Sequence, residues 1–108
     1  MRVTGCVAVL MACLGLGSCS TSEVPDEFCR AASRAIELVE ESPTPVTFDP
    51  RHTEVLGAFN DNQPTWGSEA SSPAIQLGGA FADWSLSPTE ENAARVHSQA
   101  EAFVQQYC

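Results

Sequence analysis

The sequence contains no lysine, and its only basic residues are five arginines among 108 residues. Beyond residue 18 it carries 14 acidic residues against four arginines, so the formal charge of this part is −10. A surface with so few cations cannot neutralise many phosphates. The composition therefore argues against nucleic acid as a partner and against adhesion of the protein body to anionic lipid headgroups.

The sequence also lacks an apolar run long enough to span a bilayer. Residues 3–17, which follow Arg2, are uncharged and mostly apolar. Fifteen residues in a helix cover roughly 22 Å, whereas the hydrocarbon core of a bilayer is roughly 30 Å thick. The run therefore fits the apolar region of a secretory signal better than a membrane-spanning helix.

A short motif follows this run. The stretch Leu16-Gly17-Ser18-Cys19 resembles the lipobox of bacterial lipoproteins, in which an aliphatic residue and two small residues precede a cysteine. The resemblance implies that Cys19 carries a diacylglyceryl group and that the chain is cleaved before it. Residues 1–18 would then be a lipoprotein signal peptide, and residues 19–25 would be the lipidated cysteine and a short polar tether.

Other readings of the N-terminal segment stay open. Residues 10–13 also read as a lipobox, but they would leave an apolar region of only about eight residues before the cysteine. Small residues around positions 15–20 would suit ordinary signal peptidase and give a secreted protein. An uncleaved anchor, or no export at all, is the remaining alternative.

The five cysteines are Cys6, Cys13, Cys19, Cys29 and Cys108. The first two would leave with the signal, and Cys19 would carry lipid. Cys29 and Cys108 then remain as a pair in an oxidising compartment, which predicts one disulfide. Two free buried thiols are the alternative.

No strand pattern competes with the helical ones in the rest of the chain. Apolar residues at helical spacing, together with proline and capping signals, predict four helices. They are expected over residues 26–42, from Asp49-Pro50 to about 59, over 73–84, and from Ser87-Pro88 almost to residue 108.

The predicted fold is all-α, a small up-down bundle occupying residues 26–108. Cys29 falls in the first turn of the first predicted helix, and Cys108 ends the last one. The first and last helices of an up-down bundle of four are antiparallel, so these two ends lie side by side. We therefore expect the disulfide to tie the first helix to the last at the end near the tether.

Residues that would support catalysis are scarce. His52 and His97 are the only histidines, and their spacing matches no metal motif. The sequence has no G-x-S-x-G and no glycine-rich phosphate loop. We predict no catalytic residues, no metal and no cofactor, and the protein is not expected to be an enzyme.

Two tryptophans have different contexts. Trp84 lies on an apolar stripe and is expected in the core. Trp66 lies in the polar loop over residues 60–73, where we expect it to fold back over the bundle. The alternative is that Trp66 is exposed and serves as an interaction residue.

The N-terminal motif and the small helical body with two cysteines resemble the small exported lipoproteins of high-GC Gram-positive bacteria. The resemblance implies lipid anchoring on the outer face of the cytoplasmic membrane. The leading hypothesis is a non-enzymatic binding or interaction module whose partner is an unidentified protein or small molecule.

Two other functions stay as alternatives. The first is a ligand carrier, which needs an apolar pocket between helices among Phe28, Phe59, Phe81 and Phe103. The second is a metal-using enzyme, which requires His52 and His97 to converge with acidic residues.

Overall fold

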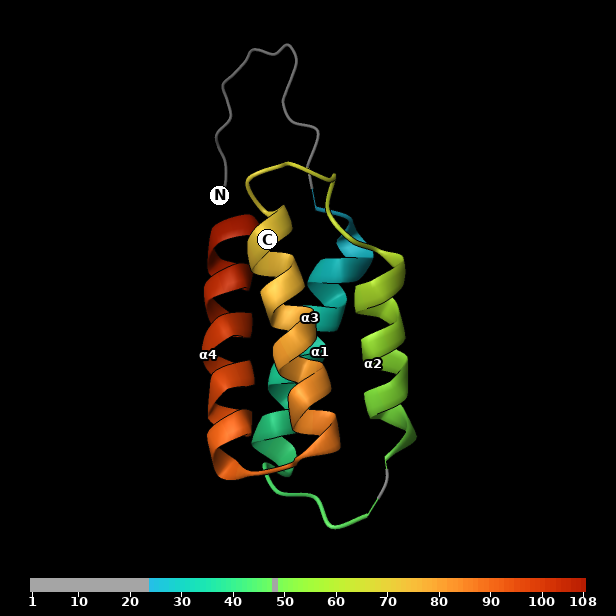
Figure 1. Ribbon diagram of the computed structural model, residues 1–108, viewed down its shortest axis with the longest axis vertical. Coiled ribbons are helices and arrows are strands. Elements are labelled where there is room, and N and C mark those ends of the chain that lie inside the picture. The colour runs from blue at the N-terminus through green and yellow to red at the C-terminus, as the bar shows by residue number, and fades with distance from the viewer. Residues whose placement is uncertain (1–23, 48) are drawn as a thin grey trace.

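The computed structural model of the chain describes residues 24–47 and 49–108. Four helices alternate in direction along the long axis of the bundle (Figure 1). No strand occurs in the described part of the chain, so the predicted all-α, four-helix, up-down fold is confirmed. The helices are α1 (Asp26–Glu41), α2 (Pro50–Asp61), α3 (Ser71–Leu86) and α4 (Glu90–Tyr107).

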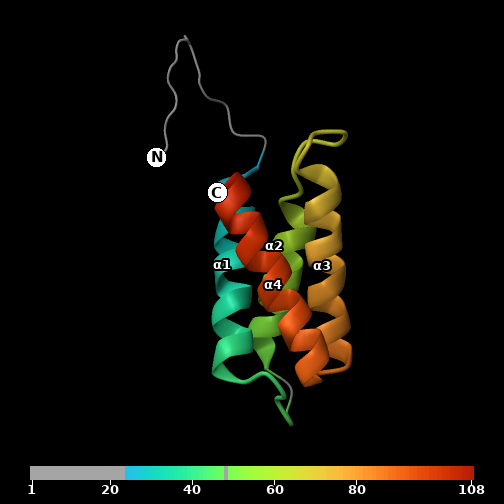
Figure 2. The same cartoon turned by 90° about the vertical axis from the view of Figure 1, so that its left-hand side faces the viewer.

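Each helix packs mainly on its two neighbours in a ring. The main contacts join α1 to α4 and α2, and join α3 to the same two helices, so α1 and α3 lie diagonally across the bundle. Figure 2 shows α4 crossing in front between α1 and α3. This arrangement gives the molecule two different ends, each with its own set of connections.

The helix boundaries follow local hydrogen bonding. The predicted start of α2 is confirmed: the Asp49 side chain accepts a hydrogen bond from the Arg51 backbone N–H at 2.9 Å, and Pro50 occupies the first turn. The predicted third helix was too short, because α3 spans residues 71–86. Its last turn is closed by the Ser87 N–H, which donates to the carbonyl of Asp83.

The predicted start of α4 at Ser87-Pro88 was wrong. Ser87 is used to end α3, so the next residue with a suitable side chain caps α4 instead. That residue is Thr89, whose hydroxyl accepts a hydrogen bond from the Asn92 N–H at 3.1 Å. The helix begins at Glu90 as a result.

The core is built around phenylalanine rings from all four helices. Phe28 contacts Phe59 and Phe103, each with ring centroids 5.0 Å apart. Phe59 contacts Phe81 at 5.7 Å. All four rings are buried, and none of them lines the described hollows of the surface. Trp84 is fully buried, as predicted.

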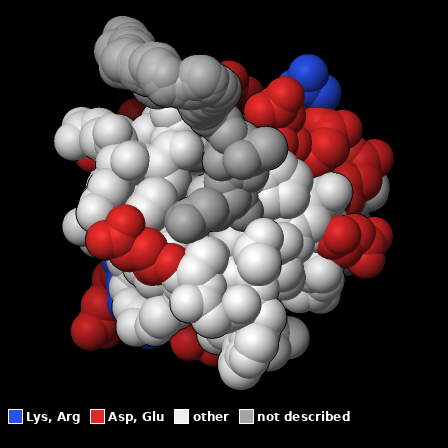
Figure 3. Space-filling model, turned by 90° about the horizontal axis from the view of Figure 1, so that it is seen from above, with Lys and Arg blue, Asp and Glu red and all other residues white. Residues whose placement is uncertain are grey.

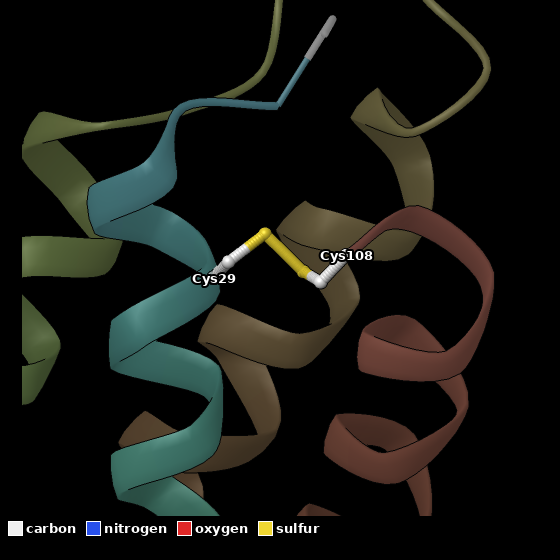
Figure 4. The surroundings of a disulfide bond; sticks show 2 residues. All are labelled: Cys29 and Cys108. Carbon is white, nitrogen blue, oxygen red and sulfur yellow. A yellow bond between two sulfur atoms is a disulfide. The ribbon is translucent and has the colours of Figure 1, made fainter. Parts of the chain in front are cut away.

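The predicted disulfide is confirmed. Cys29 and Cys108 are bonded, with their Cα atoms 5.9 Å apart, and the bond links the first turn of α1 to the residue that follows α4 (Figure 4). Val24 is buried at the same end, so the first described residue is packed into the core. We call this the tether end, which also includes residues 62–70 between α2 and α3; the opposite end is the groove end.

None of the helices in the described part of the chain is both long and apolar enough to cross a membrane.

Removing the disulfide should destabilise the bundle strongly. The bond joins residues 79 apart in sequence, and the chain-entropy model attributes about 4.5 kcal/mol of stability to closing such a loop. A Cys29→Ala, Cys108→Ala double variant should therefore lose about 4 kcal/mol of unfolding free energy, measured by urea denaturation followed by circular dichroism.

The matched control is addition of a reductant. It should lower the stability of the wild type to that of the variant and leave the variant unchanged. Equal stability of the oxidised wild type and the variant would contradict the expectation.

Candidate functional site

A groove of about 440 Å³ opens at the groove end of the bundle. One wall is the connection between α1 and α2, a second is the start of α2, and a third is the end of α3 with the turn leading to α4. Its lining is predominantly apolar, with a few polar groups. The lining residues are Pro45, Val46, Thr47, Asp49, His52, Thr53, Leu56, Ser85, Leu86 and Pro88.

An ion-pair network holds the α1–α2 connection in place. Arg51 donates to Asp49 at 2.7 Å and forms an ion pair with Glu41 at 2.9 Å, so it joins the end of α1 to the start of α2. The hydrogen bonds from Arg51 lower the pKa of the Asp49 carboxyl to about 2. Asp49 is thus ionised at neutral pH, with its oxygens committed to the guanidinium and backbone of Arg51.

Trp84 fixes the other part of this connection. Its ring is buried in the core, while its indole N–H donates to the backbone carbonyl of Pro43 at 2.7 Å. This bond ties the proline-rich segment directly to α3. A buried indole N–H needs a hydrogen-bond acceptor. Because Pro43 supplies it, the segment that follows Pro43 is held where it forms one wall of the groove.

His52 forms part of the groove wall. Its ring stacks on Trp84, with centroids 4.5 Å apart and planes 30° apart, and meets the edge of Phe81 at 5.9 Å. Burial lowers the pKa of His52 below its ordinary value; Arg51 adds to this effect and the Asp49 carboxylate opposes it. The imidazole has no side-chain hydrogen bond within the described chain, so its ring nitrogens are available to a ligand.

Ser85 supplies a second polar group to the same groove. Its Oγ is buried and has no hydrogen-bond partner among the described residues. An unsatisfied buried hydroxyl costs about 1–3 kcal/mol. Because this hydroxyl is buried, the polar group that the groove offers to a ligand is the His52 ring. The groove therefore combines apolar walls with a polar side chain, the arrangement expected of a ligand site.

Two large apolar side chains stand at the margin of the groove. Val46 is 96% exposed and Leu86 is 85% exposed. They come from opposite walls, the α1–α2 connection and the last residue of α3. Together they extend the apolar surface of the groove outward onto the end of the bundle.

The sequence-predicted residues lie elsewhere. Cys19 is outside the described residues. Trp66 is 85% exposed in the loop at the tether end, so the expectation that it folds back over the bundle was wrong. The loop is anchored by other groups, including the buried Pro64, and needs no tryptophan to cover it.

The two histidines do not converge. His52 stacks on α3 aromatic rings, whereas His97 on α4 contacts Glu40 of α1 at 2.8 Å and Glu101 at 3.5 Å. The described part of the chain contains no group of three or more His, Cys, Asp or Glu residues suited to holding a metal ion. The arrangement required by the metal-enzyme hypothesis is therefore missing from it.

Sequence reasoning missed the groove because its lining comes from two stretches far apart in the sequence, residues 45–56 and 85–88. Two apolar residues could have indicated an exposed apolar surface at this end. Leu86 follows Trp84 by two residues, so helical periodicity places it off the buried stripe of α3. Val46 is a large apolar residue in the proline-rich connection, outside any predicted helix.

Comparisons with known protein families, with curated proteins and with solved structures found no match to this chain.

The pKa of His52 should make stability depend on pH. Because burial disfavours the charged ring, the unfolded chain binds the proton more tightly than the folded one. The unfolding free energy should therefore fall as the pH drops from about 6.5 toward the lower pKa of the folded state. An NMR titration of the His97→Gln variant, where His52 is the only histidine, measures this pKa directly.

The control is a His52→Phe variant, which keeps an aromatic ring against Trp84 but cannot titrate. Its urea stability should lack this part of the pH slope. A His52 ring that titrates at 6.5 or above would contradict the assignment.

Proposed function

We propose that this protein is an exported lipoprotein, held by lipid on Cys19 at the outer face of the cytoplasmic membrane, and that it is a non-enzymatic binding module. The groove at the end of the bundle is its binding site. The observation that carries this proposal is a predominantly apolar groove of about 440 Å³ whose wall includes the His52 ring, which makes no hydrogen bond within the described part of the chain.

The position of the groove agrees with anchoring at Cys19. Val24 is buried at the tether end, and Cys19 is only five residues before it, a distance of at most about 18 Å of extended chain. Lipid on Cys19 would hold the tether end at the bilayer. The groove opens at the opposite end of the bundle, so a bound partner would meet no obstruction from the membrane.

The proposed partner is another protein that inserts an apolar side chain into the groove. A small molecule inside the groove would leave Val46 and Leu86 in water, because both stand at its margin almost fully exposed. A protein surface would cover them, while a polar group beside the inserted side chain bonds to the His52 ring. Buried apolar anchors surrounded by less critical contacts are typical of such interfaces.

The anchoring is tested by the intact mass of the protein purified from the membrane fraction of its native host. The expected species begins at Cys19, carries a diacylglyceryl group and is two hydrogens lighter because of the disulfide. A Cys19→Ala variant, which cannot accept the lipid, should lose the added mass and leave the membrane fraction. A soluble wild-type species beginning near Thr21 would overturn the anchoring.

The binding site is tested by photocrosslinking on intact cells. A photoreactive residue at position 86 should give a discrete crosslinked protein, and Val46→Asp on the opposite wall should abolish it. The matched control places the same photoreactive residue at position 75, since Ile75 is also exposed on α3 but lies outside the groove. Identical products from both positions, or a product unaffected by Val46→Asp, would reject the groove as the site.

A further inference from the structure

The loop at the tether end presents one large aromatic side chain to solvent. Trp66 is 85% exposed, and its indole N–H has no acceptor in the described part of the chain. The loop runs over residues 62–70, on the same end of the bundle as Val24 (Figures 1 and 2). The chain that leads back to Cys19 therefore leaves the bundle at the end where this tryptophan stands.

The loop holds Trp66 in a defined position. The Ser68 N–H donates to the Thr65 carbonyl at 3.0 Å, which closes a turn with Trp66 and Gly67 at its centre. Gly67 has φ +83°, a conformation that other residues rarely adopt, and it is the position where this turn requires glycine. The turn thus presents the indole at the tip of an ordered loop.

Both ends of the loop are also fixed to the bundle. On the α2 side, the Gln63 amide donates to the Phe59 carbonyl at 2.7 Å. On the α3 side, the Tyr107 hydroxyl of α4 donates to the Glu69 carbonyl at 3.4 Å. These bonds restrain the segments that flank Trp66.

The turn itself is uncharged. Residues 62–68 contain no Asp, Glu or Arg, and the nearest acids in sequence are Asp61 and Glu69. Figure 3 looks onto the tether end and shows white surface interrupted by several acidic side chains. An indole on such a surface can enter the boundary between headgroups and acyl chains, where its apolar ring is buried and its N–H stays hydrated.

We propose that Trp66 inserts into the interfacial region of the lipid bilayer and is a second membrane contact beside the lipid on Cys19. This inference rests on the proposed anchoring. The tether of about 18 Å brings the tether end to the bilayer surface, and Trp66 is the large aromatic group exposed there. Two contacts restrict the tilt of the body, so the groove end stays directed away from the membrane.

The acidic character of the protein gives the contact a lipid preference. With a body charge of −10, the tether end is repelled by anionic headgroups but not by zwitterionic ones. The insertion of Trp66 should therefore be stronger in phosphatidylcholine vesicles than in vesicles that also contain phosphatidylglycerol. Added salt should reduce this difference, because it screens the repulsion.

The test uses the lipidated protein purified from host membranes and reconstituted into phosphatidylcholine vesicles that carry brominated acyl chains. Bromine quenches tryptophan emission only at close range. Trp84 is buried inside the bundle, so it reports the background. The wild type should show blue-shifted and partly quenched emission, and Trp66→Phe should lose the quenchable component.

A matched control moves the tryptophan to the other end. Leu86 is exposed to the same extent as Trp66, so a Leu86→Trp, Trp66→Phe variant has the same composition of tryptophans but carries the exposed one at the groove end. Its emission should resist quenching.

Flotation of the vesicles on a density gradient separates the possible failures. Protein that floats with the vesicles but shows no Trp66-dependent quenching overturns the contact and leaves the anchoring intact. Equal quenching in the variant with tryptophan at position 86 also overturns it. Protein that does not float refutes the anchoring and this inference together.

Discussion

The bond between Cys29 and Cys108 joins the first and last helices at one end of the bundle, and the difference between the two ends depends on it. A chain with four short helices has a small core, which is marginal by itself. The cross-link holds α1 against α4 where no loop connects them. It also places the first described residues beside the end of α4.

The opposite end is closed by backbone connections instead, and there the polar groups of the core determine the shape. The indole N–H of Trp84 reaches out of the core to the Pro43 carbonyl, and Arg51 links Glu41 with Asp49. These bonds fix the proline-rich connection between the end of α1 and α3. The hollow between them is the groove, with His52 stacked on Trp84 as part of its wall.

The two ends suit two different surroundings. The tether end displays Trp66 at the tip of an ordered turn whose own residues are uncharged. The groove end has an apolar hollow with the His52 ring in its wall. Acidic residues occur at both ends, such as Asp26 at the tether end and Glu41 at the groove end, and the net negative charge opposes the approach of anionic partners.

The sequence by itself determined the four helices, the up-down order and the disulfide, because these follow from periodicity, proline and capping signals, and cysteine placement along the chain. The exact helix boundaries depended on which residue caps each helix. Ser87 caps the end of α3, and Thr89 caps the start of α4. The exposure of Trp66 involves a local turn with Gly67 at its centre, but whether the ring also folds back over the bundle depends on how the loop packs on the helices. The groove is lined by residues 45–56 and 85–88, two stretches far apart in the sequence. Only the tertiary structure decided these features, since contacts such as the hydrogen bond from Trp84 to Pro43 join residues 41 positions apart.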